Sequence, residues 1–214
     1  MSRRIKVTGR AKAYFPPDKI TLTLTIEAAD KEYQKTLDTA TEKLEGVQRA
    51  LAAVGFEKEE LKTAAFNVSD EYEYFQTEKN GNERQLVGYS CTHRLRLEFD
   101  MDMERLGKVL EALSQCEANA EFHIIFGVKD IDSLEKQLMA QAVKDANEKA
   151  EILAKAAGVK LKEITAISSG DFNDNIVSPT YFEQGVSVLR AVPVDITPES
   201  VDGNISVNVE WEIE

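Results

Sequence analysis

The sequence predicts an α+β fold built as two-layer sandwiches, with mostly antiparallel sheets that are each covered by helices. Two observations predict it. Apolar and polar residues alternate in several segments, most regularly at 19–28, 87–99 and 205–213, and this period of two indicates half-buried strands. Between such segments apolar residues recur every three or four positions, which indicates amphipathic helices. Helices and hairpins mixed in this order are typical of α+β proteins.

The composition is that of an ordinary folded protein with a surplus of acids. The chain has 214 residues, of which 43% are apolar and 30% charged, and it is long enough to bury a core without disulfides. Its 38 acidic and 26 basic residues give a formal charge of −12. A nucleic-acid surface needs clustered cations, so we expect no nucleic-acid partner. No apolar run approaches the ~18 residues that cross a bilayer, so we also expect no membrane span.

The first half of the chain predicts a βαββ-like group. Residues 3–9 form a short strand, and Pro16-Pro17 forces an extended turn before the regular strand at 19–28. A narrow apolar stripe from Tyr33 to Val54 predicts a helix that ends at Gly55. The stripe is also heptad-like, so a coiled coil is the alternative, but a helix covering a sheet fits the flanking strands better.

A hairpin follows that helix. The outgoing strand begins at Phe66, and Asn80-Gly81 is a strong hairpin signal before the return strand at 87–99. About thirteen residues is long for a strand, so we expect this one to bend or to serve two sheets. Aromatic residues cluster around the hairpin, either through cross-strand packing or as an exposed patch that binds protein. These residues are Tyr72, Tyr74, Phe75 and Tyr89.

The second half predicts two helices and a long irregular loop. Its elements are a helix at 102–113, a strand at 122–128, a helix at 132–157, a strand at 161–168, a loop at 171–200 and a final strand at 205–213. The second of these helices carries small residues at the centre of its apolar face, so it can approach a sheet closely. We place a boundary near residue 85, between a βαββ-like part at 1–85 and a second α+β part at 86–214. The C-terminal strand could complete either sheet.

Charge is distributed unevenly between the two ends. Residues 1–12 hold five basic residues and no acid, whereas residues 171–214 hold nine acids and one base, Arg190. The opposite ends could therefore pair, within one chain or between chains. The simpler explanation is a solvated edge strand whose Lys and Arg repel other edges.

No group of residues predicts catalysis, metal binding or cofactor binding. Cys91 and His93 share one face of a predicted strand, while Cys116 and His123 lie elsewhere in the sequence. Their spacings match no usual zinc pattern, and no glycine-rich phosphate loop or nucleophile elbow accompanies them. We therefore expect two reduced, metal-free thiols, no cofactor and no catalytic residues.

The segment 171–195 is the candidate interaction segment. It is too long and too rich in Pro and aromatic residues to be a passive connection, and a disordered linker would carry fewer aromatic and branched residues. It either docks on a neighbouring subunit or folds over its own sheet. The possible oligomer-interface residues are Phe172, Tyr181, Phe182, Val186 and Val188.

Several short passages, taken in order, resemble one known family. The chain begins Ile5-Lys-Val-Thr-Gly9, followed by Pro17-Asp18-Lys19 and an alternating strand. Further passages are Ala53-Val-Gly55, Glu60-Leu-Lys-Thr63 with Phe66, Val87-Gly88-Tyr89, Asp145-Ala146, Lys149-Ala150, Leu153-Ala154, Gly158-Val159, Thr197-Pro198 and Gly203. Together they resemble the SIMPL-domain family, a domain of unknown function, over nearly the whole chain.

This resemblance implies two-layer α+β structure and, in some members, large ring-like homo-oligomers. It also implies loose links of bacterial members to oxidative and envelope stress, and many relatives are periplasmic or surface-exposed. The family has no established catalytic residues, so none is carried over to this chain. Because the basic start of the chain is followed by no apolar segment, we expect no export signal and a cytoplasmic protein.

Two functional hypotheses follow. The first is a non-enzymatic, self-associating interaction protein, with a stress-related role and a homo-oligomeric state. The alternative is a small-molecule-binding protein or an enzyme with an unrecognised pocket. A deep apolar cavity with polar groups converging around His93 or His123 would favour that alternative.

Overall fold

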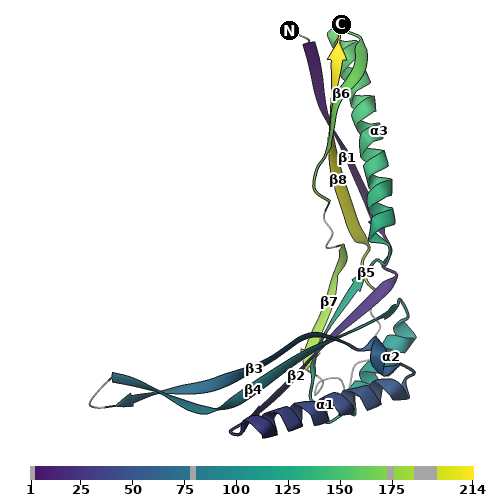
Figure 1. The fold of residues 1–214 in the computed structure, drawn as a ribbon. Coiled ribbons are helices and arrows are strands. Elements are labelled where there is room, and N and C mark those ends of the chain that lie inside the picture. Colours follow the sequence, from purple (N-terminus) through teal and green to yellow (C-terminus); the bar gives the residue numbers. More distant parts are fainter. Residues whose placement is uncertain (1–2, 78–80, 173–175, 186–196) are drawn as a thin grey trace. The chain divides into compact units, whose positions relative to one another are not determined.

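The computed structural model describes residues 3–77, 81–172, 176–185 and 197–214 (Figure 1). The elements in order are β1 (Arg3–Phe15), β2 (Lys19–Asp30), α1 (Tyr33–Ala53), a 3-10 turn (Lys58–Glu60), β3 (Lys62–Thr77), β4 (Gly81–Asp100), α2 (Met103–Ser114), β5 (Glu121–Gly127), α3 (Ile131–Ala157), β6 (Leu161–Ser169), β7 (Val177–Gly185) and β8 (Val201–Ile213). The predicted α+β class, with antiparallel sheets and helices packed on them, is confirmed. Within these described residues, no helix is long and apolar enough to cross a membrane.

The chain forms two compact units. The first, unit 1, comprises Met1–Asp18, Gly127–Pro179 and Pro198–Glu214, and the second, unit 2, comprises Lys19–Phe126 and Thr180–Thr197. This division differs from the expected boundary near residue 85, which falls inside β4. Since β3 and β4 pair along almost their whole length, a boundary there would cut a continuous ladder.

Unit 1 contains a three-stranded sheet in the order β1-β8-β6. The C-terminal strand β8 is central and runs antiparallel to β1 from Arg3↔Ile213 to Phe15↔Val201. The helix α3 covers one face of this sheet through its small residues Ala142, Ala146 and Ala150, all fully buried. The predicted close approach is real at Gly9, where an added Cβ would lie 1.9 Å from the carbonyl oxygen of Ala142.

Unit 2 contains a five-stranded sheet in the order β3-β4-β2-β5-β7. The helix α1 packs against β2 and β4, and α2 packs against α1. Val47 and Leu51 of α1 and Leu110 of α2 lie in one apolar core with the strands. The apolar stripe of α1 therefore covers a sheet, as expected, and does not form a coiled coil. The long strand β4 lies between β2 and β3 in one sheet, so it does not serve two.

The strand β7 lies inside the segment 171–200 that was expected to be a loop. Two features hide it from a search for alternation. It stands at the edge of its sheet, where Pro179 needs no ladder partner on its outer side. A polar residue also occupies a buried position, because Ser178 is 4% exposed and its hydroxyl donates to the carbonyl of Glu199 at 2.7 Å.

Candidate functional site

The hairpin of β3 and β4 extends beyond the rest of its sheet (Figure 1). The strand β2 pairs with β4 only between Tyr89 and Asp100. Residues 71–77 and 81–88 therefore pair only with each other among the described strands, and we call them the arm. A two-stranded ribbon without a covering layer is marginally stable by itself in water. The arm thus has surface to bury that its own unit does not cover.

One face of the arm is aromatic. The register places Tyr72 opposite Leu86 and Tyr74 opposite Arg84, so these four side chains share a face. The guanidinium of Arg84 lies over the ring of Tyr72, 3.6 Å from its centre. Tyr74 is 68% exposed, and Leu86 is also exposed. Of the two explanations for the aromatic cluster, Tyr72 fits cross-strand packing and Tyr74 fits an exposed patch.

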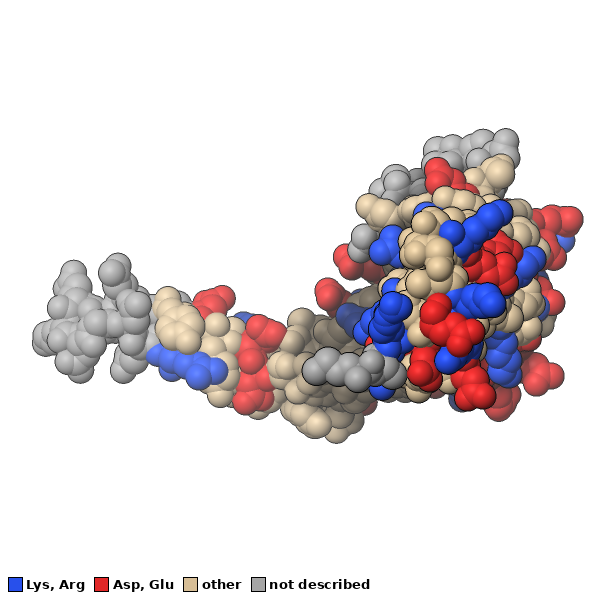
Figure 2. All heavy atoms as spheres, turned by 90° about the horizontal axis from the view of Figure 1, so that it is seen from above, with Lys and Arg blue, Asp and Glu red and all other residues tan. Residues whose placement is uncertain are grey.

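The opposite face of the arm is acidic. Glu71 and Glu73 alternate with the two tyrosines along β3, and both carboxylates are exposed. Glu71 accepts a hydrogen bond from the hydroxyl of Ser90, while Asp70 lies at the base of the arm. Figure 2 shows acidic side chains gathered along the arm, with a smaller basic patch beside them. The arm is therefore an amphipathic ribbon.

A basic surface lies on β1 at the edge of the other sheet. Alternation places Arg4, Lys6, Arg10 and Lys12 on the face opposite α3, and we call these four residues the basic edge. Arg4 pairs with Glu210 of β8 at 3.4 Å, and Lys12 pairs with Asp202 at 2.8 Å. The oppositely charged chain ends thus pair within one chain. Exposed pairs of this kind contribute about 0–1 kcal/mol each.

Two residues of the basic edge form no ion pair within the described part of the chain. Among the described side chains, no acid forms an ion pair with Lys6 or Arg10, and both cations are exposed. The backbone amide of Arg10 instead donates to the Asp145 carboxylate of α3 at 2.7 Å. Lys149 donates to the same oxygen at 2.6 Å and, with the Arg10 amide, holds the pKa of Asp145 below its ordinary value. Asp145 and Lys149, which belong to the passages quoted for the family resemblance, therefore fix α3 on β1.

The Cys and His residues are placed for packing. His93 is 7% exposed; its Nε2 lies 3.0 Å from Thr63 Oγ1, and its ring contacts Phe66 edge-to-face. Burial lowers the pKa of His93 and raises the pKa of Cys91, so near neutral pH both are uncharged. Both cysteines are free, with Cys116 only partly buried. Within the described residues, no group of three or more His, Cys, Asp or Glu is placed to hold a metal ion.

The predicted interface residues separate in the structure. Phe172 is half-buried against the apolar clusters of unit 1, so that residue folds over its own sheet. Tyr181 on β7 is exposed, with its ring centre 6.0 Å from that of His123. The side chain of Phe182, and both Val186 and Val188, lie outside the described residues.

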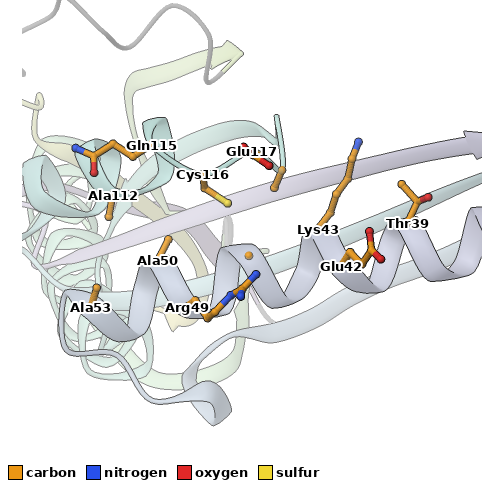
Figure 3. A pocket seen from close by; sticks show the side chains of 12 residues that line it. Thr39, Glu42, Lys43, Arg49, Ala50, Ala53, Ala112, Gln115, Cys116 and Glu117 are labelled. Carbon is orange, nitrogen blue, oxygen red and sulfur yellow. The ribbon is translucent and has the colours of Figure 1, made fainter.

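An open groove of about 830 Å³ runs beside α1 in unit 2 (Figure 3). Small residues line it together with charged ones, and the sulfur of Cys116 points toward α1. That sulfur lies 3.1 Å from the position that a Cβ added at Gly46 would take. Neither His93 nor His123 lines the groove, so it is not the cavity around a histidine that the alternative hypothesis expected.

The sequence indicates the residue types of these surfaces but not how far the arm extends. The basic residues of β1 and the hairpin aromatics both stood out, but the length of the arm did not. The polar run from Asn82 to Gln85 shows no apolar alternation, because no described element of unit 2 covers either face of the arm.

Comparison with known proteins gives the family. The SIMPL family, described as a protein of unknown function (DUF541), matches residues 5–211. The chain therefore belongs to the SIMPL family. A "26 kDa periplasmic immunogenic protein" of Brucella melitensis biotype 1 is 27% identical over 98% of this chain and 84% of the relative. A protein of the same description from Brucella abortus strain S19 is 26% identical over the same shares.

These relatives overturn the expected location. The cytoplasmic expectation rested on the absence of an apolar segment after the basic start, and it is contradicted by two periplasmic relatives that match almost the whole chain. Among solved structures, a hydrolase from Listeria innocua aligns over 96% of this chain and 92% of that chain. Its identity is 10% and its TM-score 0.20, too low to support any conclusion about activity.

Proposed function

We propose that this protein is a non-enzymatic periplasmic protein that acts by associating with further copies of itself. The proposed periplasmic location rests on the names of the two Brucella relatives, which match 98% of the chain. A role in oxidative or envelope stress is the part of the proposal that rests on the family resemblance alone.

One observation carries the self-association, namely the arm. It presents Tyr74 and Leu86 to solvent on a ribbon that no described element covers. An exposed apolar surface on a projecting element is typical of a protein interaction site. Packing this ribbon against a partner would supply the second layer that it lacks.

The chemistry of the titratable groups supports a non-enzymatic role. A buried thiol held protonated is a poor nucleophile, and an imidazole packed against Thr63 and Phe66 is poorly placed to exchange protons with a substrate. The alternative of small-molecule binding rests on the open groove beside α1, which small and charged side chains line. Native mass spectrometry of the purified protein tests that alternative by the presence of a bound compound.

The mass of the protein in solution tests the self-association. We expect the wild-type chain to exceed its monomer mass of 23.9 kDa by light scattering. The variant Tyr74→Ser/Leu86→Ser should shift the mass toward that of a monomer while its circular dichroism stays unchanged. Ile164→Ser/Ile167→Ser removes two exposed apolar side chains from β6, outside the arm, and should leave the mass unchanged. An arm variant that keeps the wild-type mass would refute the role of the arm.

The predicted interface around β7 is tested separately. Tyr181→Ser removes its exposed aromatic ring, and a fall in mass with this variant would add β7 to the interface. The same substitution at Phe182, Val186 and Val188 extends the test to the remaining residues of that prediction.

A further inference from the structure

Among the described strands each sheet has two edges, which are β1 and β6 in unit 1 and β3 and β7 in unit 2. In the described part of the chain, β1 ends the sheet of unit 1, and β3 ends the sheet of unit 2. The arm leaves the outer backbone donors and acceptors of β3 open to a further strand. On β1 the amide of Arg10 and the carbonyl of Thr8 already bond to Asp145 and Lys149 of α3, so the edge is open mainly toward Lys6 and Arg4. The addition of a strand from a partner is a common way to satisfy such an edge.

The charges of these two edges are opposite. The basic edge on β1 carries Lys6 and Arg10 without described ion pairs, and the arm carries Glu71 and Glu73. Two copies of β1 would repel each other, as would two copies of the arm. A contact between β1 and the arm would instead place cations against carboxylates. The charges therefore disfavour like-with-like pairing and favour a mixed pair.

The apolar surfaces agree with the same arrangement. Asp145 of α3 contacts β1 at Arg10, and Lys149, one turn further along the helix, contacts it at Thr8. Leu153 lies one more turn along the same side of α3, so it also lies along β1. Leu153 is 48% exposed and the adjacent Ile152 is 67% exposed. An apolar patch therefore borders the β1 edge on its helix side.

One orientation satisfies both surfaces at once. Successive side chains of a strand point to opposite faces, so adding β3 to β1 would direct alternate residues of the arm to the two faces of the unit 1 sheet. When Glu71 and Glu73 point to the face opposite α3, their carboxylates meet the basic edge. Tyr72 and Tyr74 then fall on the helix side, where Leu153 and Ile152 are exposed.

We propose that the arm of one copy adds to the β1 edge of a second copy, through the outer edge of β3. The inference rests on the proposed self-association and names its partner surface. Because it joins two different surfaces, each copy can accept one arm and offer another, and the contact is head-to-tail. Assemblies larger than a dimer follow from it.

Charge reversal with mixing tests this contact. The edge variant Lys6→Glu/Arg10→Glu and the arm variant Glu71→Lys/Glu73→Lys each place like charges together, and each should weaken association by at least roughly tenfold. In an equimolar mixture of the two variants, the acidic arm of the edge variant meets the basic edge of the arm variant, and the basic arm of the arm variant meets the acidic edge of the edge variant. A single chain that carries all four changes also restores opposite charges. We expect both to regain the wild-type mass by light scattering. The control Lys136→Glu/Lys144→Glu changes the net charge equally on the outer face of α3 and should leave the mass unchanged.

The outcomes separate the two proposals. A wild-type chain that is monomeric would overturn both. An assembled wild type with an edge variant that keeps its mass, or a mixture that stays dissociated, would overturn this contact and leave self-association standing. A disulfide trap covers variants that fail to fold. In a Cys116→Ser background, chains with Lys6→Cys and chains with Glu73→Cys should cross-link to each other faster than to themselves. Equal or slower mixed cross-linking would overturn the contact.

Discussion

The backbone amide of Arg10 donates a hydrogen bond to the Asp145 carboxylate at 2.7 Å, one residue beyond the glycine on which α3 packs. This contact joins the N-terminal strand to a helix 135 residues further along the chain. Three of the passages that resemble the SIMPL family therefore meet at one structural contact, those around Gly9, Asp145 and Lys149. They build unit 1, and they leave the open face of β1 free to carry charge.

The tight contact at Gly9 predicts a large effect of a small substitution. Gly9→Ala places a methyl group 1.9 Å from the carbonyl oxygen of Ala142, so α3 must move away from the sheet. We expect the free energy of unfolding, measured by urea denaturation, to fall by about 3 kcal/mol or more. Gly107→Ala in α2 meets no atom within 4 Å and should raise it by about 0.5–1 kcal/mol. Equal effects of both changes would contradict the packing described here.

The burial of His93 predicts a dependence of stability on pH. Burial lowers the pKa of His93 in the folded state below the unfolded value of 6.5, so the unfolded chain binds more protons between those two values. The free energy of unfolding is therefore not reduced by His93 above pH ~6.5, and it decreases as the pH falls below that value. His93→Gln should flatten this dependence between about pH 5 and 7, a range that lies above the titration of ordinary carboxylates. An unchanged dependence in His93→Gln would contradict this assignment.

The two thiols should differ in reactivity. Cys91 is buried and its pKa is raised, whereas Cys116 is only partly buried beside the groove. A thiol reagent should therefore modify Cys116 in the native protein and both residues after unfolding. Cys116→Ser should abolish the native reaction. Equal rates at both cysteines in the native state, or a disulfide between them, would contradict this assignment.

The stacking of Arg84 on Tyr72 should stabilise the arm locally. Arg84→Ala removes a cation–π contact at an exposed site, which contributes about 0.5–1 kcal/mol. We expect faster amide hydrogen exchange at residues 71–77 and an unchanged Tm for the whole protein. Arg94→Ala removes an exposed arginine from the same strand outside the arm and should not change exchange there. If Arg84→Ala leaves exchange in the arm unaltered, the stacking is not what orders it.

Most of the fold could be predicted because periodicity is a local property. The alternation at 205–213 and the small apolar face of α3 both correspond to a buried side in the structure. The strand β7 could not be predicted in this way, since its edge position tolerates Pro179 and its buried position holds Ser178. Alternation marks a strand only where one face meets an apolar core.

The candidate site was predictable in its parts but not in its arrangement. The basic residues of β1 and the tyrosines of the hairpin were both evident as patterns. Which edges remain unpaired depends on the order of strands in each sheet, which local patterns do not encode. Phe172 is a further example, because the sequence does not show that this aromatic residue of the predicted interface is half-buried on its own unit.

The solution mass of the wild-type chain, measured by sedimentation equilibrium over a range of concentrations, tests the central claim of self-association most directly. We predict a weight-average mass above 23.9 kDa that decreases toward this value on dilution or with rising salt, because the proposed contact pairs opposite charges. A mass of 23.9 kDa at every concentration would contradict the claim.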